Sequence, residues 1–347
     1  MKHKYRFTAV LLVGILLVSI LLTNLYVRTE EAGETDKLHV VTSFYPMYIA
    51  ALNVIGDQDG VELENLSEPQ TGCLHDYQMT PADMRLLSGA DVFIVNGGGI
   101  ESFLYDVAEA YPELTVINAS GQVELLPESE QEHDHDHEAD PDEEHSHAAD
   151  ANDEHSDADE YHDEADSDDH MHAHTHSDEN AHAWMSIPDY RIQVQTIADG
   201  LMEADPAHAD VYQKNATAYD EKLAALEKKA EEVKTYTEGR DLVIFHEAYD
   251  YVAEDYGMHV IYTLNLDEER QVSAGEVADV VSEIKEHGIT TVFAEELYGS
   301  DMGSTIERET DAKVCYLDTM VRGEYEADSY IKAMENNIRM IREAFAP

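Results

Sequence analysis

Short apolar segments alternate with amphipathic segments along most of the chain. The apolar "LHVVTSF" is followed by the helical "PMYIAALNVIG", and the alternation continues through "VELENLS", "TPADMRLLSGA", "DVFIVNGG", "ESFLYDVAEAYP" and "LTVINAS". In the second of these helices Thr80 is a suitable N-cap, with Pro81 at the first helical position and Asp83 at N3. Strands that alternate with helices of this length are typical of a parallel sheet covered on both faces. The pattern predicts an α/β lobe over residues 38–185.

The same rhythm returns in the second half of the chain. Apolar strands are expected at "DLVIF", "HVIYT", "TTVFA" and "KVCYL", with a helix from about Glu276 to His287 and a last helix that ends near Ala344. We therefore predict a second α/β lobe over residues 239–347. Each lobe should contain a four-stranded, mostly parallel sheet.

The segment between the lobes, residues 186–238, has a different pattern. Its apolar or small residues alternate at spacings of four and three and form a helical stripe: Tyr212, Ala216, Tyr219, Leu223, Leu226, Ala230 and Val233. Asp205 and Pro206 are the expected N-cap and first helical residue. A coiled coil is the alternative, but alanines at the seam are weak for pairing. We expect one long, rigid helix that packs along both lobes.

Residues 128–179 interrupt the first lobe with a different composition. They contain 23 Asp or Glu, 11 His, no Lys or Arg, and no Leu, Ile, Val or Phe. Such a segment cannot bury enough apolar surface to offset the entropy of ordering, so we predict a disordered insertion whose two ends lie close together. The whole chain has 75 acidic and 21 basic residues, a formal net charge of −54. This charge argues against nucleic acid and favours cations as partners.

Residues 1–30 have the pattern of a membrane anchor or signal segment. Lys2, Lys4 and Arg6 precede an uncharged apolar run from Thr8 to Val27. About 20 apolar residues can span a bilayer, and the positive flank predicts an N-terminus in the cytoplasm. We therefore expect the rest of the chain to lie outside the cell membrane, on an uncleaved anchor; a cleaved signal peptide is the alternative.

Potential metal ligands follow several of the predicted strands. His246 directly follows "DLVIF", Glu295 and Glu296 follow "TTVFA", and His75 lies in the loop before a capped helix. His182 lies where the composition becomes globular again, next but one to Trp184. Ligands of open α/β sheets bind beyond the carboxyl ends of the strands. Three histidines and one glutamate would complete the four-coordinate shell of zinc.

Catalysis and cysteine chemistry are the competing interpretations of these residues. The zinc hydrolase pattern H-E-x-x-H fails at "HEAYD", where Asp250 stands in place of the second histidine. Glu247 or Glu296 could in principle serve as a general base, but no other catalytic motif is present, so we predict that the protein is not an enzyme. The two cysteines, Cys73 and Cys315, are 242 positions apart and leave both a disulfide and free thiols open.

Five stretches taken together resemble the metal-binding solute-binding proteins of zinc and manganese ABC transporters. They are "VVTSFYPMY", "CLHDYQMTPADMRLLSGADVFIVNGGGIESFL", "NAHAWMS", "VIFHEAYDYVAEDYGM" and "TVFAEELYGSDMGSTIERETDAKVCYLD". The resemblance implies two α/β lobes joined by one long helix, with the metal in the cleft between them. It carries the four ligands onto His75, His182, His246 and Glu295, with Glu296 as the alternative to Glu295.

The resemblance also implies a function. Histidine at the third ligand position favours a zinc receptor that delivers Zn²⁺ to an ABC permease and its ATPase, as a monomer outside the cytoplasm. A manganese receptor is the nearer alternative, and a zinc buffer or sensor that acts through the His-rich tract is the more distant one. Relatives with a lipid anchor attach it to a cysteine that is missing here, so the N-terminal segment would take its place. A thiolate ligand from Cys73 would be a further departure.

Overall fold

The structure is a computed structural model that describes residues 37–67, 75, 77–128, 179–266 and 272–346. These residues belong to one compact unit. The apolar run from Thr8 to Val27 and almost all of the acidic tract lie outside the described residues. Within the described part of the chain, no helix is both long and apolar enough to cross a membrane.

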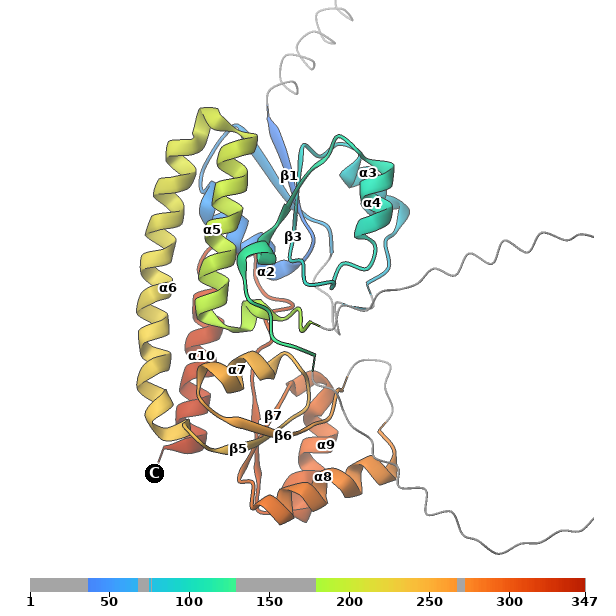
Figure 1. Ribbon diagram of the computed structural model, residues 1–347, viewed down its shortest axis with the longest axis vertical. Coiled ribbons are helices and arrows are strands. Elements are labelled where there is room, and N and C mark those ends of the chain that lie inside the picture. The colour runs from blue at the N-terminus through green and yellow to red at the C-terminus, as the bar shows by residue number, and fades with distance from the viewer. Residues whose placement is uncertain (1–36, 68–74, 76, 129–178, 267–271, 347) are drawn as a thin grey trace, which may run out of the picture. The chain divides into compact units, whose positions relative to one another are not determined.

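The first lobe is built on a four-stranded parallel sheet with the strand order β2-β1-β3-β4 (Figure 1). Its elements alternate along the chain as predicted, and a 3₁₀ turn follows the last strand. They are β1 Leu38–Thr42, α2 Tyr45–Ile55, β2 Val61–Asn65, α3 Pro81–Leu87, β3 Val92–Val95, α4 Leu104–Ala110, β4 Thr115–Asn118 and η2 Ala119–Gln122.

The second lobe repeats this topology with the strand order β6-β5-β7-β8, again all parallel. Its elements are β5 Asp241–Ile244, α7 Tyr249–Asp255, β6 His259–Thr263, α8 Ala274–His287, β7 Thr291–Ala294, α9 Glu296–Glu309, β8 Lys313–Tyr316 and α10 Ser329–Phe345. The prediction of two α/β lobes with four-stranded sheets is therefore confirmed, and both sheets are entirely parallel.

Hydrophobicity along each strand matches its place in the sheet. The inner strands β3 and β7, "VFIV" and "TVFA", are buried at every position, because helices cover both faces. The edge strand β2, "VELEN", alternates between half-buried and exposed residues. The helix starts also follow the sequence, since Thr80 and Asp83 form a complete capping box at α3. The parallel arrangement places all the carboxyl ends of a sheet at one edge, where the loops that carry the predicted ligands begin.

One long helix runs beside both lobes. After η3 (Ala183–Met185), the chain forms α5 (Ile187–Ala204), the short turn η4 (Pro206–His208) and α6 (Ala209–Thr237). Helix α6 has 29 residues and packs on α5 and α2 as well as on α10, as Figure 1 shows. Its predicted apolar stripe is buried except for Ala230, which is partly buried. Asp205 and Pro206 are the N-cap and first residue as expected, but the first turn is the 3₁₀ turn η4, which continues directly into α6 at Ala209.

The two ends of the acidic insertion are adjacent, as predicted. Pro127 and Glu179 form an isolated antiparallel bridge, and the Asn180 N–H donates to the Leu126 carbonyl at 2.7 Å. The hydroxyl of Tyr251, from α7 in the second lobe, accepts from the Leu126 N–H and donates to the Asn180 carbonyl. The base of the insertion is therefore attached to both lobes.

Candidate metal centre

His182 is the most buried of the predicted ligands and has a defined environment. It immediately precedes η3, its side chain is 2% exposed, and its Nδ1 lies 2.9 Å from Oδ1 of Asn180. Trp184, the only tryptophan of the chain, lies close by, with 5.0 Å between the centroids of the two rings. Burial lowers the pKa of His182 well below its usual value, and His246 and His75 lower it further. His182 is therefore neutral at physiological pH, the form that binds metal ions.

His75 and Glu247 complete a group of three potential ligands. Nε2 of His75 lies 3.6 Å from Oε1 of Glu247, and the same oxygen lies 3.8 Å from Nδ1 of His182. One ligand atom from each of the three residues lies within 4.8 Å of the other two. His75 belongs to the loop before α3 in the first lobe, whereas Glu247 follows β5 in the second. The group therefore joins the two lobes, and it is the only such group of His, Cys, Asp or Glu within the described residues.

The environment of Glu247 is unusual for a carboxylate. Burial, together with the nearby carboxylates of Glu128 and Asp250, raises the pKa of Glu247 to about 7. A divalent cation beside Oε1 would offset the free-energy cost of ionising this carboxylate, because it supplies the positive charge that the described surroundings do not provide. Sequence reasoning considered Glu247 only as a general base. Its position next to His246, beyond the end of β5, was the signal that could have identified it as a ligand.

His246 contacts His182, but it is not part of that three-residue group. The centroids of the two rings are 4.9 Å apart and the rings are nearly perpendicular. Nδ1 of His246 accepts from the N–H of Ala248 at 3.2 Å. The proton of the neutral ring then lies on Nε2, so His246 must change this hydrogen bond before Nε2 can bind a metal.

Glu295 follows β7 at the N-cap position of α9 and is separate from the three-residue group. It lines a cavity of about 730 Å³ together with Asp318, Thr319 and Arg322. Burial raises the pKa of Glu295, whereas Arg322 and a hydrogen bond with Thr319 lower it. Tyr249 links this cavity to His246: its ring lies 6.3 Å from the His246 ring, and its pKa is raised by burial and by both Glu295 and Asp318.

Two further carboxylates border this cavity. Glu296, the alternative to Glu295, is exposed. Asp318 is a residue that sequence reasoning did not consider. It lies two residues beyond the end of β8, and its side chain accepts from the N–H of Met320 at 2.8 Å. Burial raises the pKa of Asp318. The same strand-end rule that selected Glu295 would have found it.

A buried network in the first lobe supports the segment that carries His182. The fully buried carboxylate of Glu101 accepts from the Ser43 hydroxyl and from the N–H groups of Asn96 and Gly97, at 2.7 to 3.0 Å. The amide of Asn96 then donates to the carbonyl of Ala181 at 2.9 Å. Burial raises the pKa of Glu101 to about 6, and the hydrogen bonds from Ser43, Gly97 and Asn96 oppose this rise. The loop after β3 therefore positions the residue next to His182.

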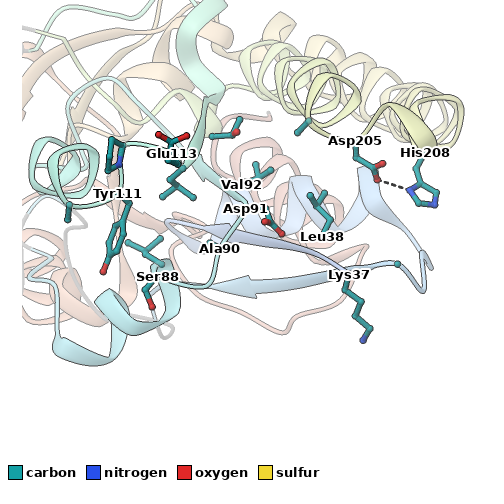
Figure 2. Close-up of a pocket in the computed structure, with 17 residues that line it drawn as sticks. Lys37, Leu38, Ser88, Ala90, Asp91, Val92, Tyr111, Glu113, Asp205 and His208 are labelled. Atoms are coloured by element: carbon teal, nitrogen blue, oxygen red, sulfur yellow. Dashed lines mark hydrogen bonds and ion pairs between the residues drawn. The ribbon is translucent and has the colours of Figure 1, made fainter. Parts of the chain in front are cut away.

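A second cavity, of about 860 Å³, lies at the opposite ends of the strands of the first sheet. Figure 2 shows Leu38 and Val92, at the starts of β1 and β3, beside the paired side chains of Asp205 and His208. Nδ1 of His208 lies 2.6 Å from Oδ2 of Asp205. The described residues around this cavity contain no group of three potential ligands within 4.8 Å. It also lies at the amino ends of the strands, where open α/β folds do not usually bind ligands.

The cysteines are not part of the described centre. Cys315 is a free, buried thiol on β8, and burial raises its pKa to about 12. A reactive or metal-binding cysteine needs a lowered pKa, so Cys315 is a structural residue. Cys73, the thiolate alternative, lies outside the described residues.

Comparisons with known proteins agree with this architecture. A family model described as zinc-uptake complex component A, periplasmic (ZnuA), matches residues 40–344. The high-affinity zinc uptake system protein ZnuA of Bacillus subtilis is 28% identical over 323 residues, which cover 89% of this chain and 88% of that protein. The manganese-binding lipoprotein MntA of Halalkalibacterium halodurans is 26% identical over 316 residues, with the same two coverages.

The fold is also similar to that of solved structures. The crystal structure of Zn(II)-bound AdcA from Streptococcus pneumoniae matches with a TM-score of 0.68 at 23% identity. The match covers 90% of this chain and 58% of that one. At this identity the similarity supports the two-lobe fold, and the choice of metal has to be argued from the site itself.

Proposed function

The chain belongs to the ZnuA family of periplasmic metal-uptake proteins, and on this premise we propose that it captures Zn²⁺ and delivers it to an ABC permease. Proteins of this family are solute-binding proteins rather than enzymes; they bind metal ions outside the cytoplasm and work with a permease and its ATPase. The observation that carries the proposal is the group formed by His75, His182 and Glu247, whose ligand atoms lie within 4.8 Å of one another.

The proposed ligands are His75, His182, His246 and one carboxylate, which is either Glu295, as the sequence predicts, or Glu247, which groups with His75 and His182. Imidazole nitrogen suits zinc, whereas manganese prefers oxygen ligands, so a set with three histidines favours zinc. The contact between the rings of His182 and His246 supports including the third histidine. Oε1 of Glu247, which the sequence suggested only as a general base, lies 3.6 Å from Nε2 of His75 and 3.8 Å from Nδ1 of His182.

We also propose the domain organisation that the sequence predicts. Residues 1–30 would anchor the protein to the outer face of the membrane, and residues 128–179 would form a His-rich insertion in the first lobe, 38–185. Residues 186–238 connect this lobe to the second, 239–347. The insertion would hold several ions weakly and raise the metal concentration near the centre, which speeds loading without changing the affinity of the centre itself. A monomer is sufficient, because the chain itself carries all the proposed ligands.

The fluorescence of Trp184 provides a selective test, because its ring lies 5.0 Å from that of His182 and no second tryptophan is present. Zinc is titrated into the full chain and into a chain without residues 130–176. We expect the emission to change and to saturate at one equivalent of high-affinity zinc in both proteins, and His182→Ala to abolish this response. If deletion of residues 130–176 removes high-affinity binding, the protein is instead a buffer or sensor that acts through the insertion.

A manganese receptor is the alternative within the family, and the similarity to MntA supports keeping it. Competition between zinc and manganese on the deleted chain decides between them. We expect zinc to displace manganese at equal concentrations, and the opposite order would identify a manganese receptor. Delivery is tested separately, by measuring zinc uptake in cells that express either the wild type or His182→Ala at low external zinc. Equal uptake would contradict delivery through this centre.

A further inference from the structure

We propose that Asn180 is a positioning residue that presets His182 for metal binding and ties it to the ligand-bearing segment of the second lobe. The role of Asn180 in metal binding rests on the proposed function, whereas its effect on the imidazole of His182 does not. Asn180 is 1% exposed and lies two residues before His182, at the base of the insertion. Both ends of its side-chain amide make hydrogen bonds, Nδ2 to the second lobe and Oδ1 to His182.

The orientation of the Asn180 amide is determined by its neighbours in the second lobe. Nδ2 lies 2.9 Å from the carbonyl oxygen of Glu247 and 3.4 Å from Oδ2 of Asp250. Both partners accept hydrogen bonds, so the NH₂ group of the amide must face them. Oδ1 therefore faces His182, where it also accepts from the backbone N–H of His182 at 3.1 Å.

This orientation selects one tautomer of His182. Because Oδ1 can only accept, Nδ1 of His182, at 2.9 Å, must carry the proton. In a neutral imidazole the other nitrogen, Nε2, then keeps the lone pair that a metal ion requires. A hydrogen bond of this kind to the nitrogen that does not bind the metal is the usual way in which proteins orient histidine ligands. His182 is thus preset, whereas His246 is held with its Nδ1 as an acceptor.

Asn180 also connects two segments that are distant in sequence. Its NH₂ group holds the carbonyl of Glu247, and the N–H of Glu247 donates to Oδ1 of Asn265 at 3.1 Å. The backbone of Glu247 is therefore held on both sides. The carbonyl of Asn180 accepts from the hydroxyl of Tyr251 at 2.6 Å. One buried side chain thus sets the distance between His182 of the first lobe and Glu247 of the second.

Two substitutions separate these roles. Asn180→Leu has a similar size and removes both functions, whereas Asn180→Asp keeps an acceptor for Nδ1 of His182 and loses the donor to Glu247. Asn215→Leu is the matched control, because the Asn215 amide on α6 donates to the carbonyls of Val54 and Ile55, remote from His182. The tautomer of His182 is read in metal-free full chain by nitrogen NMR with ¹⁵N-labelled histidine, assigned with His182→Gln. Zinc affinity is read from Trp184 emission against a competing chelator.

We expect the wild type to carry the proton on Nδ1 of His182, Asn180→Asp to keep this tautomer, and Asn180→Leu to give a mixture of tautomers. Zinc affinity should fall roughly 10- to 100-fold in Asn180→Leu, and by less in Asn180→Asp, while Asn215→Leu binds as the wild type does. A proton on Nε2 of His182 in the wild type would overturn the proposal, whether or not the variants fold. A folded Asn180→Leu variant that binds zinc as tightly as the wild type would also overturn the proposal. If the wild type shows the expected tautomer but does not bind zinc, the proposed function is contradicted and the effect of Asn180 on His182 is not.

Discussion

Nε2 of His75 lies 3.6 Å from Oε1 of Glu247, although the two residues are 172 positions apart and belong to different lobes. The contact brings an imidazole of the first lobe next to a largely buried carboxylate of the second. Both side chains would stabilise a cation bound between them. Without a cation, the unfavourable free energy of burying the Glu247 carboxylate is not offset. The first prediction follows from this cost.

Glu247→Gln should weaken zinc binding and stabilise the metal-free protein at alkaline pH. In the folded state the pKa of Glu247 is about 7, against 4.5 as the reference value, so its stability contribution is present below pH 4.5 and lost as the pH rises through 7. Glu247→Gln does not lose this stability as the pH rises, because Gln has no proton to release. Its zinc affinity should fall roughly tenfold or more at pH 7.5 and should depend less on pH between 5 and 7, because no proton has to leave residue 247.

The comparison with Glu295→Gln identifies the carboxylate ligand. If Glu295 provides it, the Glu295 variant loses affinity and Glu247→Gln keeps it. Trp184 emission at several pH values measures both affinities, and denaturant unfolding without metal measures the stability of each variant.

His246→Ala should abolish high-affinity zinc binding, whereas His208→Ala should leave it unchanged. The His246 ring contacts the His182 ring, while His208 pairs with Asp205 at the other end of the first sheet (Figure 2). His208→Ala should cost at most about 1 kcal/mol of stability, because the pair is partly exposed to solvent. Loss of zinc binding in both variants would point to a general effect on folding.

Gly98→Ala should reduce zinc affinity through the backbone. Gly98 has φ = +68°, and an added Cβ would lie 3.1 Å from Cα of Ala181, the residue before His182. The matched control is Gly239→Ala, since Gly239 has φ = +72° but no atom within 4 Å of such a Cβ. Each variant should lose about 1 kcal/mol from the positive φ alone. Only Gly98→Ala should also bind zinc more weakly, and equal affinities would show that Ala181 does not transmit the displacement.

Asp255→Asn should remove a pH dependence of stability. The pKa of Asp255 is raised from 3.8 to about 7, because burial and nearby Asp189 outweigh the opposite effect of a hydrogen bond from Ser186. The folded state therefore binds a proton between these pH values that the unfolded state has lost, and the stabilisation present below pH 3.8 disappears as the pH rises through 7. The variant should be more stable than the wild type by roughly 2 kcal/mol at pH 8. Urea unfolding at pH 5 and pH 8 measures the difference, and parallel pH profiles would contradict it.

The fold was largely predictable because its determinants are local. Apolar period, capping residues and strand length place the elements, as the capping box of Thr80 and Asp83 at α3 shows. At the start of the long helix the sequence located the first turn but not its type. Asp205 precedes Pro206 as expected, but its carboxylate accepts from the Tyr212 hydroxyl and pairs with His208 instead of capping the backbone, and the first turn is the 3₁₀ turn η4.

The sequence predicted which strand ends carry the candidate ligands, but it did not predict the distances between these ligands. The rule that ligands bind beyond the carboxyl ends of strands selected His246 and Glu295, and it could equally have selected Asp318. It could not show that Glu247 approaches His75 and His182, because that distance depends on how the two lobes pack. The orientation of the Asn180 amide is equally non-local, since it depends on a carbonyl 67 residues away.

The bridge between Pro127 and Glu179 affects how freely the insertion can change during evolution. The lobe itself joins the two residues on either side of the insertion, so the stability of the lobe depends little on the sequence between them. The entropic cost of closing the loop also rises only logarithmically with the length of the loop. Mutations that lengthen, shorten or replace the acidic tract are therefore nearly neutral for folding. The length and composition of this segment can therefore change while the centre beside Trp184 stays as it is.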